Sequence, residues 1–264
     1  MGSVAVIGGS GFSDPGFWDV VERESIETPY GAPSAPLMRI RRGAGEFLYL
    51  ARHGEGHAIP PHRINYRANI WALREVGVDQ VVGLAAVGGI GRDYRPGRLA
   101  VPDQIIDYTW GREHTFFDSG DVRHVDFTSP YCDGLRRLLL RAAQRADLDP
   151  VDGGIYGATQ GPRLETGAEI ARMERDGCDM VGMTGMPEAA MARELELCYA
   201  CCAYVVNWAA GKGAGEITMS EIESYLGDFR QVTQPLLDAL VDPRDLRSPS
   251  AIEKIRADCE TVFS

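Results

Sequence analysis

The sequence lacks the long apolar runs of a membrane protein. Of its 264 residues, 44% are hydrophobic, but no stretch approaches the roughly 18 consecutive apolar residues that a transmembrane helix needs. The first residues lead straight into a strand pattern and not into a charged and then apolar leader, so no signal peptide is expected. These absences predict a soluble, cytoplasmic protein that does not bind membranes.

Basic clusters are scarce as well. The formal net charge is −11, and the only compact basic run is Arg-Ile-Arg-Arg at residues 39–42. A nucleic-acid surface needs clustered Lys and Arg to neutralise phosphates. The sequence therefore predicts small-molecule partners and no nucleic acid.

Metal-binding patterns are weak. Cys198, Cys201 and Cys202 suggest a cluster, but residues 197–207 read as a buried strand in which positions 198 and 201 point to opposite faces. Buried thiols acting as small hydrophobes fit better. His53 and His57 are four residues apart, but the surrounding glycines and prolines disfavour the helix that would put both on one face. No metal site is expected.

Strands and helices alternate along the chain. Strands are predicted at residues 3–7, 80–86, 101–109, 151–157, 178–183 and 197–207, of which the first, the second and the last read as buried, and a hairpin at 37–42 and 46–52. The strand at 80–86 is expected to end in a glycine loop at 88–91. Helices are predicted at residues 66–76, stopped by Gly77, at 130–146, with Ser129 as N-cap and Pro130 at the first helical position, and at 166–175 and 187–195. Another is predicted at 218–240, opened by a capping box of Thr218 and Glu221, and a further C-terminal helix at about 250–263. Without linker or repeat, this order predicts one α/β domain over residues 1–264, with a central sheet flanked by helices.

Two loops that follow predicted strands have the chemistry of anion binding. Gly-Gly-Ser-Gly at residues 8–11 offers backbone amides and the Ser10 hydroxyl, but it lacks the third glycine of a dinucleotide fingerprint. Arg52 and His53 end another strand, and an arginine can hold phosphate oxygens with a bidentate fork. A phosphate or small-anion loop is the better interpretation, and a plain turn stays open.

Glu165 and Leu164 lie between a predicted strand and a helix. Thr166 and Glu169 have the spacing of a capping box, which starts the helix directly after them. The pair could form the floor for a flat heteroaromatic ligand or be an ordinary connection with a solvated Glu. Polar residues at other strand ends (Ser10, Arg52, His53, Thr184, Asn207) would meet Glu165 at one edge of the sheet, where α/β folds bind ligands.

Five motifs together resemble the trimeric nucleoside phosphorylases, in the branch that acts on methylthio nucleosides. The segments are Ile-Gly-Gly-Ser-Gly (7–11), Ala-Arg-His-Gly (51–54), Asn-Tyr-Arg-Ala-Asn-Ile-Trp-Ala-Leu (65–73), Gly-Pro-Arg (161–163) and Gly-Met-Thr-Gly-Met-Pro-Glu (182–188). The resemblance covers about residues 3–240. It implies a mixed sheet in one domain, a homotrimer, inorganic phosphate as co-substrate, and neither a metal nor an organic cofactor.

The resemblance also implies roles for individual residues. Met183 would pack under the ribose, and Leu164 stands where the family usually places a Phe against the purine. Ala85 stands where methylthioadenosine phosphorylases have a Thr, which removes one phosphate donor. His124 resembles a residue that a neighbouring subunit lends to the 5′ pocket. Phosphate would be held by Ser10, Arg52, His53, Ala86 and Thr184, and catalytic roles would fall to Asn207, Glu165 and His53.

Two positions select the base in this family. Adenine-selective members have an Asp where this chain has Asn207, and a small hydroxyl residue where it has Glu165. A carboxylate at Glu165 accepts from the N1–H of a 6-oxopurine, which adenine lacks. Asn207 can donate to O6 and accept from a protonated N7. The pair therefore predicts a 6-oxopurine base.

Met219 and Ile222 are three residues apart on one face of a predicted helix. They suit an apolar methylthio group at the 5′ position, or they are ordinary core residues. Together with the 6-oxopurine reader, they predict phosphorolysis of 5′-methylthioinosine to hypoxanthine and 5-methylthioribose-1-phosphate. A methylthioadenosine phosphorylase, a general inosine/guanosine phosphorylase, a hydrolytic nucleosidase and a nucleoside-binding protein without turnover stay open, the last favoured by Ala85.

Overall fold

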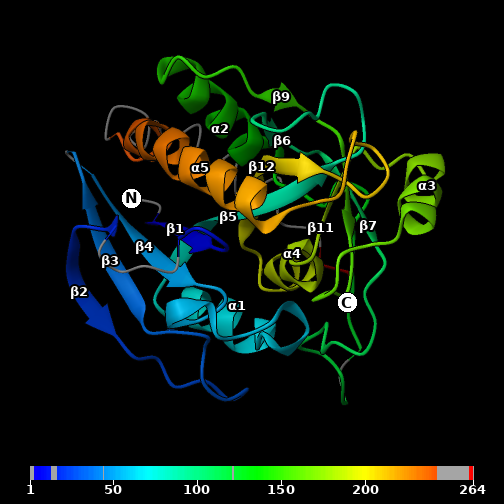
Figure 1. The fold of residues 1–264 in the computed structure, drawn as a ribbon. Coiled ribbons are helices and arrows are strands. Elements are labelled where there is room, and N and C mark those ends of the chain that lie inside the picture. The colour runs from blue at the N-terminus through cyan, green and yellow to red at the C-terminus, as the bar shows by residue number, and fades with distance from the viewer. Residues whose placement is uncertain (1–2, 13–16, 44, 121, 243–261, 264) are drawn as a thin grey trace.

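The computed structural model describes residues 3–12, 17–43, 45–120, 122–242 and 262–263, and its centre is a large mixed sheet (Figure 1). The strands of the sheet are β1 (Ser3–Gly8), β2 (Val20–Glu24), β3 (Leu37–Arg42), β4 (Gly45–Ala51), β5 (Val78–Gly89), β6 (Leu99–Val101), β7 (Gln104–Asp107), β9 (Val151–Asp152), β10 (Ile155–Ala158), β11 (Met180–Gly182) and β12 (Cys198–Trp208). A separate two-stranded ribbon joins β8 (His124–Val125) to β13 (Val262–Phe263).

The central strands are parallel. β1 pairs in parallel with β4 and β5, and β12 pairs in parallel with β5 over most of its length. β11 is antiparallel to β5, which makes the sheet mixed. β1, β5 and β12 are buried along almost their whole length, as expected for continuous apolar runs covered on both faces.

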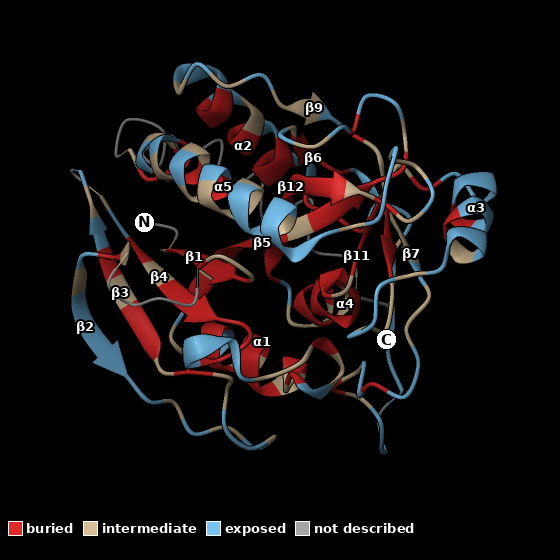
Figure 2. Cartoon of the chain, in the orientation of Figure 1, coloured by how far each residue is buried: buried red, intermediate tan, exposed pale blue. Residues whose placement is uncertain are grey.

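Five helices cover the sheet in the described part of the chain. In Figure 1, α2 (Asp133–Arg145) and α5 (Met219–Leu240) lie above the central strands, and α1 (Tyr66–Glu75) and α4 (Gly185–Glu194) lie below them. α3 (Gly167–Arg175) packs at one end of the sheet over a small apolar cluster that includes Ile170 and Met173. Figure 2 shows the buried central strands, the exposed outer face of α5, and α4 buried along almost its whole length. Among the described residues, no helix has the length and apolarity to cross a bilayer.

Several local predictions are confirmed. The hairpin forms as β3 and β4, and α1 gives way to Gly77 at a φ of 77°. Thr166 and Glu169 exchange both bonds of a capping box at the start of α3. At α5 only half of the predicted box forms, because Thr218 accepts from the Glu221 amide without the return bond. Cys198, Cys201 and Cys202 are buried in β12, as expected of thiols that pack as small hydrophobes.

Three strand predictions are wrong in their limits. The strand expected over 101–109 breaks at Pro102, which has no amide hydrogen for a ladder. The strand expected over 151–157 breaks at Gly153 and Gly154, whose φ values of 100° and 102° lie outside the β region. β5 continues through Gly88 and Gly89, where a loop was expected, because β11 and β12 pair with both residues.

Other elements were misplaced or missed. Ser129 and Pro130 do not cap α2, which begins at Asp133 after Cys132. The Cys132 amide donates to the Tyr199 carbonyl, so the chain docks on β12 before the helix begins. β2 was not predicted. The expected C-terminal helix falls mostly on residues 243–261, outside the described chain. At Val262 and Phe263 that prediction is wrong, since both lie in β13.

Candidate active site

A cavity of about 720 Å³ opens where the central strands end. Every residue assigned to the site from sequence lines it, with the exception of His124. These lining residues are Ser10, Arg52, His53, Ala85, Ala86, Leu164, Glu165, Met183, Thr184, Asn207, Met219 and Ile222. The expected meeting of polar strand ends at one edge of the sheet is therefore observed.

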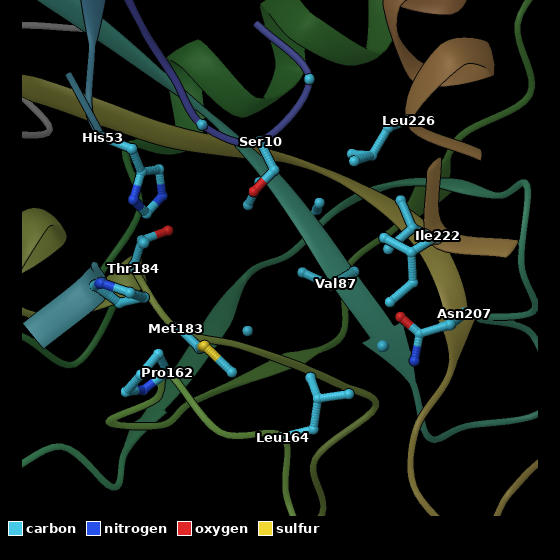
Figure 3. Close-up of a pocket in the computed structure, with 18 of the residues that line it drawn as sticks. Ser10, His53, Val87, Pro162, Leu164, Met183, Thr184, Asn207, Ile222 and Leu226 are labelled. Atoms are coloured by element: carbon cyan, nitrogen blue, oxygen red, sulfur yellow. The ribbon is translucent and has the colours of Figure 1, made fainter. Parts of the chain in front are cut away.

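The register of the sheet brings the anion-binding candidates together. Gly8 in β1 lies opposite Ala51 in β4, so Ser10 follows one strand where Arg52 and His53 follow the other. Thr184 is the N-cap of α4, two residues after the end of β11. Figure 3 shows Ser10, His53 and Thr184 in one part of the cavity and Leu164 and Asn207 in another.

Arg52 does not offer the bidentate fork that the sequence predicts. Its Nε and Nη2 donate to the two carboxylate oxygens of Glu188, at 2.7 and 2.8 Å. Nη1 and Nη2 also donate to the carbonyls of Leu84 and Ile7. Burial alone would lower the pKa of Arg52, but the adjacent Glu188 carboxylate outweighs it and the pKa is raised. Arg52 lines the cavity as a permanent cation with one uncommitted Nη1 hydrogen, because four of its five donors are engaged.

His53 is neutral. Burial, followed by the charge of Arg52, lowers its pKa to about 3. Its Nδ1 lies 2.8 Å from the Ile59 carbonyl, and a carbonyl only accepts, so Nδ1 carries the hydrogen. Nε2 is then the acceptor nitrogen, suited to a hydroxyl or a protonated phosphate oxygen.

Glu165 and Asn207 are each oriented by a neighbour. The Thr159 hydroxyl donates to Glu165 Oε1 at 2.7 Å. The Asn207 amide nitrogen donates one hydrogen to the Trp208 carbonyl at 2.7 Å. An irregularity in the pairing of β12 with β5 at Val206 lets Val206 and Asn207 both line the cavity, whereas consecutive residues of a regular strand face opposite sides.

One face of α5 closes the cavity. Met219, Ile222 and Leu226 supply apolar side chains, and Met219 is 65% exposed, so it is not a core residue. Glu223 and Arg230 share the face and were missed. The sequence could have predicted both residues, because positions 219, 222, 223, 226 and 230 recur at the helical period and so share one face of the helix.

The segment after His53 also lines the cavity and was not assigned. It contributes His57, Ala58, Pro60 and Pro61. The His57 ring stacks on that of His53 with centroids 4.2 Å apart.

Within the described residues no group of three or more His, Cys, Asp or Glu side chains could hold a metal ion.

His124 lies away from the cavity. It is exposed in β8 and pairs with Phe263 of β13. Its predicted role in a site therefore needs a second subunit.

The sequence matches the family model of the Phosphorylase superfamily over residues 3–242. The chain belongs to the phosphorylase superfamily. Within that family it is 55% identical over 225 residues to a probable S-methyl-5′-thioinosine phosphorylase of Xanthomonas campestris pv. campestris, covering 84% of this chain and 90% of the relative. It is 46% identical over 230 residues to a 6-oxopurine nucleoside phosphorylase of Pyrococcus furiosus, covering 84% and 85%.

Solved phosphorylase structures have the same fold. The methylthioadenosine phosphorylase of Schistosoma mansoni, in complex with adenine, superposes with a TM-score of 0.90 at 31% identity, covering 98% of each chain. The likeness spans the whole single-domain α/β architecture.

The neutral state of His53 has a consequence for stability. Between pH 6.5 and about 3 the unfolded chain binds a proton at this imidazole that the native chain does not, so stability falls as the pH falls below 6.5. From pH 7 to 5 the free energy of unfolding of the wild type should drop by about 2 kcal/mol more than that of His53→Asn. Urea titrations at both pH values measure this difference. Parallel losses in the two proteins would contradict the neutral, buried assignment.

Proposed function

We propose that the chain catalyses phosphorolysis of 5′-methylthioinosine to hypoxanthine and 5-methylthioribose-1-phosphate. The observation that carries this proposal is one cavity that combines Glu165, Asn207 and the apolar face of α5. The names of the relatives at 51–56% identity support the same substrate.

The base end supports a 6-oxopurine. The Asn207 amide has two hydrogens, and Trp208 takes one of them, which leaves one donor for O6 and the oxygen as acceptor for N7–H. Glu165 takes one hydrogen from Thr159 on Oε1 and keeps lone pairs for N1–H. An adenine would face the Glu165 carboxylate with its own N1 lone pair, an unpaired contact that costs roughly 1–3 kcal/mol.

The reaction needs little covalent chemistry from the protein. The bond between the ribose C1′ and the purine N9 breaks with its electron pair going to the base, and a phosphate oxygen bonds to C1′. The proton that hydrogen phosphate loses on becoming the sugar phosphate balances the proton that the base takes at N7. Asn207 stabilises the departing base by accepting a hydrogen bond from this N7–H. The cation of Arg52 and the hydroxyls of Ser10 and Thr184 hold the phosphate. Neither a metal nor an organic cofactor has a role in this scheme.

A second candidate is a general 6-oxopurine nucleoside phosphorylase. The exposed carboxylate of Glu223 lies on the same face of α5 as Ile222 and could accept from a 5′-hydroxyl. The relative from Pyrococcus furiosus carries that broader name.

The substrate is tested with three nucleosides in parallel. Phosphate-dependent release of base should be fastest, by kcat/KM, on methylthioinosine, slower on inosine and slowest on methylthioadenosine. We expect kcat/KM to fall about tenfold or more from methylthioinosine to inosine, because the methylthio contact is lost. We expect a further fall of about tenfold or more to methylthioadenosine, because one polar group is left unpaired. Faster turnover of inosine would favour the broader phosphorylase, and release of base without phosphate would favour a nucleosidase. Binding without any release would favour a nucleoside-binding protein.

Asn207 is expected to control the base. Asn207→Asp replaces the donor to O6 by an acceptor that suits a 6-amino group, so the ratio of kcat/KM for methylthioadenosine to that for methylthioinosine should rise about tenfold or more. Asn207→Ala is the matched control, because it removes both contacts and should slow both substrates without favouring the aminopurine. An unchanged ratio in Asn207→Asp would exclude this role.

We also propose that the active assembly is a homotrimer in which His124 enters a neighbouring site. Leu164 and Met219 leave apolar surface exposed at the cavity, 45% and 65% respectively, which a neighbouring subunit would cover.

Mixed assemblies test this arrangement. A His124→Ala subunit and an Asn207→Ala subunit, each nearly inactive alone, should regain activity when unfolded and refolded together. Some sites then combine an intact Asn207 with an intact His124 from the other subunit. Activity no higher than the average of the parents would contradict the shared site, and light scattering would give the subunit number.

A further inference from the structure

Arg112 is a buried cation that does not line the cavity. It lies in the irregular segment between β7 and β8, only 8% exposed, whereas Trp110 two residues earlier is 72% exposed. No described carboxylate forms an ion pair with Arg112. Its guanidinium makes six hydrogen bonds, to the carbonyls of Thr159, Gln160, Met183 and Met186, to the Gln160 side chain and to the Tyr66 hydroxyl.

These bonds join three walls of the cavity. Thr159 and Gln160 begin the loop that carries Leu164 and Glu165 at the base end. The Met183 and Met186 carbonyls bracket Thr184, at 2.9 and 2.6 Å from Arg112 Nη1.

The third wall is reached through a tyrosine. Tyr66 accepts from Arg112 Nη1 and donates to the carbonyl of Pro61, which lines the cavity after His53. One planar group therefore links the loop that reads the base, the turn under the ribose and phosphate, and the segment beside His53.

We propose that Arg112 is a positioning residue for the phosphorolysis reaction. It touches no substrate and acts by fixing the base-binding loop relative to the Met183–Thr184 turn. The inference rests on the proposed function, because it needs the cavity to be the active site.

The reaction makes this spacing matter. The nucleoside and the phosphate must be held so that a phosphate oxygen faces C1′ of the ribose. At the same time the purine must be held by the edge that carries N1, O6 and N7. A misplacement of about 1 Å between reacting groups can cost on the order of 100-fold in rate. Loss of Arg112 frees the two walls to shift against each other, while each wall keeps its own ligand contacts.

The expected signature is a split between binding and turnover. Arg112→Ala should lower kcat about 100-fold and change the KM for phosphate and for nucleoside far less. Arg112→Lys keeps the charge, but a compact ammonium cannot span three walls, so kcat should stay low. Millimolar guanidinium chloride should raise the activity of Arg112→Ala in a saturable manner, and sodium chloride at the same concentration should not.

Arg136 supplies the matched control. It is also 8% exposed and its guanidinium donates to the carbonyls of Pro102 and Val101 and to the Asp152 carboxylate, but it does not line or brace the cavity. Arg136→Ala should lose thermal stability as Arg112→Ala does and keep kcat within about threefold of the wild type at a temperature where circular dichroism shows both variants folded.

Two results would overturn the proposal. One is a folded Arg112→Ala or Arg112→Lys enzyme with kcat near the wild-type value. The other is an equal fall in kcat for Arg112→Ala and Arg136→Ala without guanidinium rescue, which would mark a purely structural role. If Arg112→Ala does not fold, Arg112→Lys carries the test. If the wild-type protein showed no phosphorolysis, the proposed function itself would be wrong. The failure of that proposal and the failure of the role of Arg112 can therefore be told apart.

Discussion

The buried pair of Arg52 and Glu188 is the interaction on which the floor of the active site depends. Arg52 directly follows β4, and its guanidinium reaches the Ile7 carbonyl of β1, the Leu84 carbonyl of β5 and the Glu188 carboxylate of α4. The Tyr199 hydroxyl of β12 donates to the same carboxylate. Four strands and a helix thus meet at one charge pair, whose members are 2% and 1% exposed at their side chains.

An ion pair buried this deeply is stable only when its hydrogen-bond geometry is good. The desolvation of two ions is offset only when their hydrogen bonds are nearly complete, and removal of one partner leaves a stranded charge. Glu188 forms an ion pair with Arg52, and His53 is uncharged. In the proposed reaction the phosphate would therefore meet the Arg52 cation together with hydroxyl and amide donors, and it would stay available as a nucleophile.

A second buried arginine lies beside the cavity in a different way. Arg52 lines the cavity, whereas Arg112 does not line it and donates mostly to backbone carbonyls behind its walls. Glu165 and Asn207, which line the cavity, each have one hydrogen-bonding site already committed to the protein. In the proposed function their remaining donors and acceptors match a 6-oxopurine, so the selectivity would depend on Thr159 and Trp208, which hold these two side chains in place.

Local features could be predicted from the sequence, because their signals act within a few residues. Continuous apolar runs predicted buried strands, Thr166 and Glu169 predicted the start of α3, and polar residues at strand ends indicated one ligand-binding edge. The pairing of Arg52 with Glu188, 136 residues apart, the six bonds of Arg112 and the lining of the cavity by both Val206 and Asn207 became visible only in the folded chain. Those contacts depend on the strand register and on the packing between segments that are distant in sequence. An arginine has many possible partners in the sequence, and only the folded chain shows which of them lie within hydrogen-bonding distance.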